Sequence, residues 1–208
     1  MIIIGEGRVG GGLRRRAERL NVPVSVVRRG SGWEAVNPVD VGPILVCTNA
    51  DDLTEVIRCT PVDRHADLVF VQNGMLDTFL GDHGMAKNTR GLLYFAVPKR
   101  GIEPQPGGDS VFSGPHAGSM ATLFRTLELG AKSVSQQDFS NEMASKLIWN
   151  CVFGLLCDVF ECTVGELCEE HRGDVEALSA ELVSVVNAGI KTTLETRGTT
   201  AGLIDYSM

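Results

Sequence analysis

The chain has 208 residues, of which 43% are hydrophobic and 22% are charged, so it can bury a sizeable core in one large or two small domains. Its net charge of −7 excludes a broad basic surface. Nucleic acid is therefore not an expected partner, because phosphates are neutralised by clustered Lys and Arg. No apolar stretch reaches the roughly 20 uninterrupted residues of a membrane helix, so we expect no membrane partner either.

The cysteines and the start of the chain indicate the compartment. Six cysteines occur with neither a CxxC pair nor histidines at metal-ligand spacing. We interpret them as reduced core thiols in a reducing compartment and expect no metal site. The chain begins in an apolar run without a basic leader, which favours a cytoplasmic protein, or a plastid protein whose targeting segment has been removed. The cysteines are Cys47, Cys59, Cys151, Cys157, Cys162 and Cys168.

Short apolar runs alternate with helix-patterned segments through the first two thirds of the chain. This alternation predicts an α/β fold with a doubly wound, mainly parallel sheet of the Rossmann type. The expected strands are residues 1–4, 22–27, 43–47, 66–71 and 92–97, then a return strand at 111–112 and a last strand at 131–134. The expected helices are residues 8–20, with the arginine run at 14–16 on the solvated outer side, a helix capped by Asp51, and residues 116–129; residues 98–108 form a loop.

The pattern changes near Gln137, after which the hydrophobic residues follow a helical period and no strand is expected. We therefore predict two domains, a nucleotide-binding Rossmann domain over residues 1–137 and a helical domain over 138–208. Helices are expected at 138–160 and 174–194, with turn and cap chemistry around Gly165 between them. Such a short helical domain buries little core by itself, so we expect it to pack on the first domain, on a partner subunit or on residues missing from this chain.

Gly5, Gly7 and Gly10 form a G-x-G-x-x-G pattern between a predicted strand and a predicted helix. The first glycine permits a tight turn, the second lets the backbone approach a pyrophosphate, and the third allows close packing of helix on strand. The helix N-terminus then offers N–H groups and a positive dipole to phosphates. We include Arg8 and Val9 in the expected cofactor site. The alternative interpretation is a glycine-rich turn that binds nothing.

The second strand ends in Arg28 and Arg29, where NAD-selective Rossmann domains carry an acidic residue for the ribose hydroxyl. An arginine there can bind a 2′-phosphate bidentately, so the pair favours NADP over NAD. The alternative is two solvated surface arginines. Thr48 and Asn49 end the third strand and are expected to contact the same cofactor.

Two further positions suggest chemistry. Asn73 follows the fourth strand at the carboxyl edge of the sheet, where doubly wound proteins bind ligands, although Asn73 and Gly74 also suit a simple turn. Lys146 and Asn150 lie four residues apart on one helix face among apolar neighbours. Partial burial of Lys146 would lower its pKa toward a useful acid/base range; the alternative is a lysine that extends to solvent.

Taken in order, the glycine motif, Gln72-Asn73-Gly74-Met75, the Lys146–Asn150 segment and Gly165-Glu166-Leu167 resemble the ketopantoate reductase family. The segments Gln72-Asn73-Gly74-Met75-Leu76 and Leu93-Tyr94-Phe95-Ala96-Val97 resemble more closely a plant and algal branch of ketopantoate-reductase-like proteins. The resemblance implies a Rossmann domain followed by a small all-helical domain like that at the C-terminus of 6-phosphogluconate dehydrogenase.

The resemblance also implies an NADPH-dependent reductase that converts a small branched 2-oxo acid into a 2-hydroxy acid. In that family the residue matching Lys146 is the general acid toward the ketone oxygen, the residue matching Asn150 orients the substrate, and the one matching Asn73 lies near the nicotinamide. A cationic proton donor suits the negative charge that develops on that oxygen. A homodimer formed through the helical domain is a further expectation.

This sequence departs from the family pattern in three places. Asn49 stands where the family commonly has Lys after its third strand, Gly154 stands where a second Asn is common, and the later helices that contact substrate have no clear counterpart. Two other hypotheses therefore stay open. In the first, the protein binds NADP(H) without catalysing a reaction. In the second, the chain is the N-terminal portion of a longer reductase.

Overall fold

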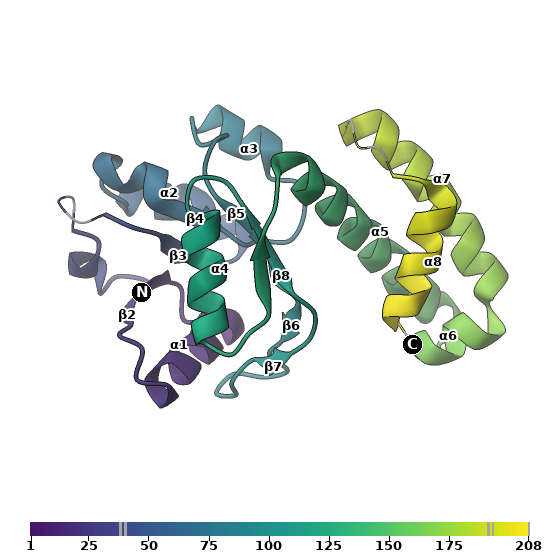
Figure 1. The fold of residues 1–208 in the computed structure, drawn as a ribbon, viewed down its shortest axis with the longest axis horizontal. Helices are drawn as coiled ribbons and strands as arrows, with labels where there is room; N and C mark the ends of the chain where they lie inside the picture. The colour runs from purple at the N-terminus through teal and green to yellow at the C-terminus, as the bar shows by residue number, and fades with distance from the viewer. Residues whose placement is uncertain (38, 40, 191, 193, 208) are drawn as a thin grey trace. The chain divides into compact units, whose positions relative to one another are not determined.

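The computed structural model describes residues 1–37, 39, 41–190, 192 and 194–207. Its contacts divide the chain into two compact units, Met1–Gln136 and Gln137–Met208, and each unit is described by itself (Figure 1). The first unit holds every strand of the described chain, and the second unit is helical.

The first unit is built on a seven-stranded sheet in the order β2-β1-β3-β4-β5-β8-β9. The first five strands in this order pair in parallel, β8 runs antiparallel to β5, and β9 runs parallel to β8. This arrangement confirms the predicted Rossmann-type α/β class. The strands are β1 (Ile2–Ile4), β2 (Ser25–Val27), β3 (Ile44–Val46), β4 (Leu68–Phe70), β5 (Arg90–Leu92), β8 (Ser110–Ser113) and β9 (Ala131–Ser133).

Both faces of the sheet are buried, which is why its strands read as continuous apolar runs. Ile3, Leu45 and Val69 are aligned across β1, β3 and β4 and belong to the core beneath α1 (Arg8–Arg19) and α4 (Ala117–Thr126). Their neighbours Ile4, Val46 and Phe70 point to the other face and join the core beneath α2 (Leu53–Cys59) and α3 (Asp77–Asp82) (Figure 1). The two-residue period of the strands separates these cores.

One predicted strand divides into two. The expected strand at 92–97 begins earlier, as β5, and then β6 (Phe95–Ala96) leaves the main sheet to pair with β7 (Gln105–Pro106). The predicted 98–108 loop therefore contains β7. A close backbone approach makes this hairpin possible, since a Cβ on Gly107 would lie 2.5 Å from the carbonyl oxygen of Tyr94. A local hydrophobic pattern does not predict such a contact.

The predicted Asp51 N-cap is also wrong. A 3-10 turn, Ala50–Asp52, precedes α2, and no side chain caps α2 through a hydrogen bond. Asp52 occupies the cap position, and its carboxylate instead accepts a hydrogen bond from Arg29 at 2.9 Å. The strand expected at 66–71 begins only at Leu68, because a 3-10 segment (Val62–Asp67) comes before it. The short helix α3 was not predicted.

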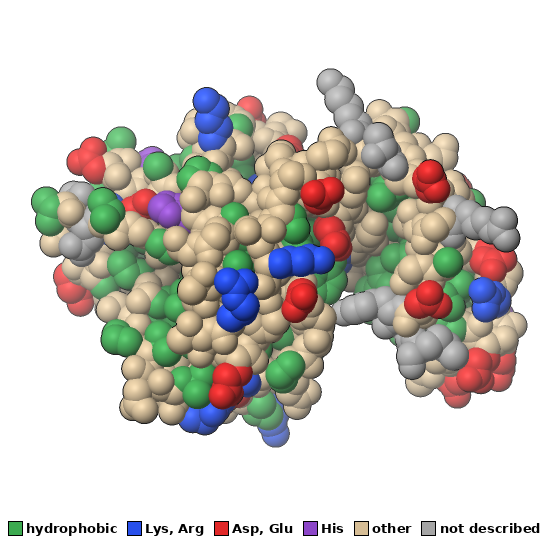
Figure 2. Space-filling view, viewed as in Figure 1, with side chains coloured by type: hydrophobic (Ala, Val, Ile, Leu, Met, Phe, Trp, Pro, Cys, Tyr) green, Lys and Arg blue, Asp and Glu red, His purple; other side chains and the backbone are tan. Residues whose placement is uncertain are grey.

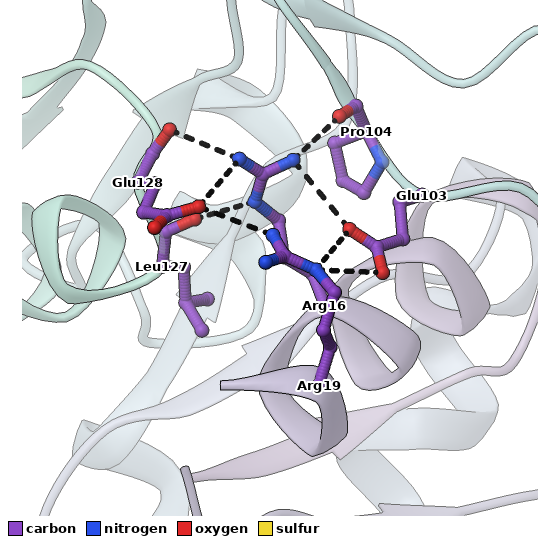
Figure 3. Close-up of polar contacts among 6 residues, drawn as sticks. All are labelled: Arg16, Arg19, Glu103, Pro104, Leu127 and Glu128. Atoms are coloured by element: carbon purple, nitrogen blue, oxygen red, sulfur yellow. Dashed lines mark hydrogen bonds and ion pairs between the residues drawn. The ribbon is translucent and has the colours of Figure 1, made fainter. Parts of the chain in front are cut away.

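Arg16 is buried rather than solvated, which corrects the expectation for the arginine run at 14–16. Its guanidinium donates to the carbonyl oxygens of Leu127 at 2.5 Å, Pro104 at 3.0 Å and Glu128 at 3.3 Å (Figure 3). Arg19 lies beside it and pairs with the carboxylates of Glu103 and Glu128. These contacts hold the 98–108 segment and the end of α4 against α1.

The 98–108 segment also packs directly on the backbone of α1 at Gly12. A Cβ at this position would lie 3.0 Å from the carbonyl oxygen of Ile102 and 3.3 Å from Val97 Cγ1. Gly11, its neighbour in the helix, has only ordinary contact distances of 3.6 Å or more to Glu6. Gly12 is therefore required by packing, whereas Gly11 is not.

The second unit consists of α5 (Gln136–Phe160), α6 (Val164–Glu170), α7 (Arg172–Ile190) and α8 (Thr196–Ser207). Ile148, Leu167, Val183 and Leu203, one from each helix, belong to its shared core. Helices α5 and α7 were predicted, although α7 ends four residues before the expected Leu194. Gly165 lies within α6 rather than in a turn, because Thr163 and Glu166 form a reciprocal capping box at the start of this helix.

Helix α5 is the one described helix that is long and apolar enough to cross a membrane by length and composition alone, a test that core helices of soluble proteins also pass. The second unit also exposes large apolar side chains at Leu155, Val159 and Val185.

The first unit shows mixed charge on the face seen in Figure 2, where basic side chains lie scattered among acidic ones.

All six cysteines are free thiols. Cys168 is buried, as expected for a core thiol, whereas Cys151 is exposed, so the expectation of core thiols fails there. Burial raises the pKa of the Cys47 thiol to about 12. Among the described residues, no group of three His, Cys, Asp or Glu could hold a metal ion.

The two neighbouring glycines of α1 predict opposite stability effects. Gly11→Ala should raise the free energy of unfolding by about 0.5–1 kcal/mol, because alanine is the better helix former and finds space. Gly12→Ala should lower it by about 1–3 kcal/mol, because its methyl group forces Ile102 away. Urea denaturation followed by circular dichroism measures both; equal values for the two variants would contradict the close approach at Gly12.

The cysteines predict an order of chemical labelling. At pH 8 the Cys47 thiol should stay neutral and resist iodoacetamide, because only the thiolate reacts and its pKa lies about four units higher. Exposed Cys151 should be labelled first. Peptide mass spectrometry of briefly treated native protein gives the order, and early labelling of Cys47 would show that its surroundings are more open than the structure indicates.

Candidate functional site

Two cavities open at the carboxyl ends of β1, β3 and β4, where doubly wound proteins bind their ligands. The larger measures about 940 Å³ and the smaller about 330 Å³, and both are formed entirely by the first unit. Five lining residues are common to the two, so the cavities meet at the glycine turn. The shared residues are Gly7, Arg8, Cys47, Thr48 and Asn49.

The glycine turn has the backbone geometry that the motif requires. Gly5 has a φ of +98°, in the left-handed region, and a Cβ on Gly10 would lie 1.9 Å from the carbonyl oxygen of Gly5. Gly7 is the N-cap of α1, and no side chain caps this helix, so its first-turn N–H groups are available to a ligand. The turn and packing roles predicted for Gly5 and Gly10 are therefore observed, whereas cofactor binding stays a prediction.

Arg28 and Arg29 line the larger cavity, but neither is an unpaired cation. Arg28 donates a hydrogen bond to the carboxylate of Glu6, inside the glycine motif, and Arg29 pairs with Asp52. The hydrogen bond from Arg28 is the main cause that lowers the pKa of Glu6, and Arg14 contributes from 2.7 Å. A phosphate at Arg28 would therefore have to compete with a carboxylate that is already in place.

The larger cavity carries a mixed set of charges. Four arginines and three carboxylates line it. Two of these arginines, Arg8 and Arg100, have no ion pair among the residues that the structure describes. The cavity therefore has a small excess of positive charge, and that excess lies on these two side chains. The charged lining residues are Arg8, Arg28, Arg29, Arg100, Glu6, Asp52 and Glu55.

The smaller cavity is lined by polar groups from the ends of β3 and β4. Gln72 donates from Nε2 to the carbonyl oxygens of Val46 at 2.9 Å and Thr48 at 3.1 Å. Its Oε1 is buried without a partner, and so is Oγ1 of Thr48. Buried polar atoms are costly unless something satisfies them, so this cavity suits a polar ligand. Asn73 also lines it and is exposed.

The structure thus gathers most predicted cofactor residues around two adjoining cavities. Val9, Thr48, Asn49 and Asn73 line the smaller one together with Gly7 and Arg8. Lys146 and Asn150 belong to α5, where Lys146 is half-buried and Asn150 is exposed. Burial lowers the pKa of Lys146, in the predicted direction. Their part in the same site stays a prediction.

Several lining residues were not predicted from the sequence. Trp33 lines the larger cavity and also contacts the core beneath α2. Its position five residues beyond Arg28 could have suggested this. Glu6 lies within the glycine motif and was overlooked because the motif leaves that position open. Arg100 gives no local signal, since the hairpin of β6 and β7 brings it to the cavity.

Residues 138–203 match the family model described as ketopantoate reductase PanE/ApbA C terminal. A comparison with curated protein sequences gave no match. Among solved structures, a PanE/ApbA family ketopantoate reductase from Ralstonia eutropha is 15% identical, with a TM-score of 0.69 over 99% of this chain and 80% of that one. A dimeric ketopantoate reductase from Staphylococcus aureus is 15% identical, with a TM-score of 0.69 over 99% and 78% of the two chains.

A D-mandelate dehydrogenase solved with NADH and anilino(oxo)acetate is also similar, at 14% identity, with a TM-score of 0.72 over 100% of this chain and 80% of that one. At these identities the likeness concerns the fold. The resemblance to a plant and algal branch stays a prediction. Residues 138–203 thus match the C-terminal domain model of ketopantoate reductases, and the fold of the whole chain is similar to that of solved ketopantoate reductases.

Proposed function

We propose that this protein is an NADPH-dependent reductase that converts a small 2-oxo acid into the corresponding 2-hydroxy acid. The observation that carries the proposal is the uncapped start of α1, behind Gly5 and Gly7, opening into a cavity of about 940 Å³. The ketopantoate reductase type of the C-terminal domain supports the reaction class.

The residues present fit a nicotinamide dinucleotide. The N–H groups of the first turn of α1 would hold the diphosphate. Arg28 and Arg29, at the end of β2, would meet the 2′-phosphate of NADPH, with Glu6 and Asp52 orienting them until it binds. Two buried polar atoms without partners would bind the carboxamide of the nicotinamide. Oε1 of Gln72 would accept a hydrogen bond from it, and the hydroxyl of Thr48 would donate or accept one. The cofactor, when bound, supplies the hydride.

Lys146 is proposed as the general acid, from the resemblance to the family. A ketone oxygen gains negative charge as the carbonyl carbon is reduced, and the protonated Nζ of Lys146 would stabilise that charge and then deliver its proton. Burial lowers the pKa of Lys146, which makes this transfer easier near neutral pH. Asn73 and Asn150 would orient the substrate. A homodimer formed through the helical domain accompanies this proposal.

One assay distinguishes the proposed reductase from a protein that binds NADP(H) without catalysis. The protein is mixed with NADPH and a panel of branched and unbranched 2-oxo acids, and absorbance of the reduced nicotinamide is followed. We expect oxidation with at least one acid. Tight NADPH binding without oxidation by any of them would favour the non-catalytic protein. A longer natural product, detected by intact mass, would favour the truncated reductase.

Lys146→Ala should retain NADPH affinity within about twofold and lose at least about a hundredfold in kcat, the lower range of general acid catalysis. In the wild type the protonated amine is the active form, so kcat should fall as pH rises through the pKa of Lys146. Burial lowers this pKa below 10.5. Lys87→Ala, at an exposed lysine in the first unit, is the control. An unchanged kcat in Lys146→Ala would remove the assigned role.

Arg28→Ala should weaken NADPH binding about tenfold, as for loss of one charge-assisted contact to a phosphate, and leave NADH binding within about twofold. Arg15→Ala is the matched control, because Arg15 is exposed on α1 and does not line the cavity. Fluorescence titration of both cofactors gives the ratio of affinities. A wild type that prefers NADH would contradict NADP selectivity.

A further inference from the structure

The 98–108 segment brings a charged side chain to the larger cavity from outside the usual nucleotide-binding elements. It leaves the main sheet after β5, forms the hairpin of β6 and β7, and returns to the sheet at β8. Arg100 lies in this segment and lines the cavity together with Gly5, Gly7 and Arg8. Neither the glycine motif nor the strand ends account for its presence.

Buried contacts fix this segment in place. The side chain of Arg16 is only 10% exposed and holds the carbonyl oxygen of Pro104 at 3.0 Å, and Arg19 holds the carboxylate of Glu103 at 3.0 Å (Figure 3). Arg16 also donates to the backbone at the end of α4. Because a buried guanidinium joins three parts of the first unit, the segment has a defined position on α1.

The direction of the segment along α1 places Arg100 at the start of the helix. Pro104 lies at Arg16, and Ile102 lies at Gly12, one helical turn earlier. The chain therefore runs parallel to α1, and two residues before Ile102 it reaches the first turn, where Arg8 lies. The lining of the larger cavity agrees with this placement, because it contains both Arg8 and Arg100.

Charge pairing separates Arg8 and Arg100 from the other two arginines of the cavity. Arg28 and Arg29 have carboxylate partners, Glu6 and Asp52, whereas Arg100 has no hydrogen bond or ion pair in the described chain. An arginine without a partner, beside the uncapped N-terminus of a 12-residue helix, is suited to a doubly charged anion. The excess positive charge of the cavity is thus concentrated near the first turn of α1.

We propose that Arg100 binds the diphosphate of the dinucleotide cofactor, from the side opposite the glycine turn, and that the 98–108 segment serves as a preformed wall of the cofactor site. The inference rests on the proposed function, since it requires a dinucleotide. Binding of the diphosphate makes Arg100 a determinant of affinity for NADPH and NADH alike. Selection between these two cofactors stays with Arg28 and Arg29.

The test compares Arg100→Ala with Lys99→Ala, which removes an adjacent exposed cation that does not line the cavity. Dissociation constants for NADPH, NADH and ADP are measured by isothermal titration calorimetry at 50 and 300 mM salt, with thermal unfolding of each variant as a check on folding. We expect Arg100→Ala to weaken all three ligands about tenfold, with the NADPH to NADH ratio unchanged. Lys99→Ala should stay within twofold of the wild type. The loss should shrink at high salt, because the contact is exposed to solvent.

The possible outcomes are distinct. Equal affinities for Arg100→Ala and Lys99→Ala overturn the inference and leave the proposed function standing. Weaker NADPH binding with unchanged NADH and ADP binding would place Arg100 at the 2′-phosphate, which also overturns it. A wild type that binds ADP with this Arg100 dependence but reduces no 2-oxo acid supports the inference while the proposed function fails. A wild type that binds none of the three ligands overturns both.

A second pair of variants tests the segment rather than the charge. Gly12→Ala displaces Ile102 and with it Arg100, so it should weaken ADP binding severalfold, whereas Gly11→Ala should leave ADP binding unchanged. If Gly12→Ala binds ADP as tightly as the wild type does, the position of the 98–108 segment does not control the contact between Arg100 and the diphosphate. That result would contradict the inference.

Discussion

The close approach of α1 to the turn after β1 is the contact on which the candidate site depends. Any side chain at Gly10 would meet the carbonyl oxygen of Gly5 at 1.9 Å, so only glycine lets the helix begin so near the strand. This proximity puts the uncapped first turn of α1 at the carboxyl edge of the sheet, where the two cavities meet. The remaining groups of the cavities are arranged around that turn.

Carboxylates control how much positive charge this turn presents. Glu6 sits inside the glycine motif and holds Arg28, while Asp52 holds Arg29, so the arginines at the end of β2 are oriented before a ligand arrives. Such pairing keeps the guanidinium groups ordered, but it also means that an anion must displace a carboxylate. Arg8 and Arg100 carry no such partner, which makes the first turn of α1 the most cationic part of the cavity.

The buried guanidinium of Arg16 extends this arrangement beyond the nucleotide-binding elements. Its donors satisfy backbone carbonyls at the end of α4 and in the 98–108 segment, and such interactions are strong because the carbonyls would otherwise lie buried without partners. The run of three arginines looks like a solvated helix face from its composition. Its third member is instead a structural cation, because partners more than 80 residues away surround it.

The sequence by itself determined the first β-strand and the glycine motif, the alternation of strands and helices, and the helical character of the second unit, since all of these follow from local hydrophobic period and local backbone requirements. It also placed Thr48, Asn49 and Asn73 at strand ends that meet at one edge of the sheet. Only the tertiary structure decided the partners of Arg28 and Arg29, the burial of Arg16, the hairpin of β6 and β7, and the arrival of Arg100 at the cavity. Those features depend on contacts between distant segments, and a linear pattern carries no record of which distant side chain satisfies which charge.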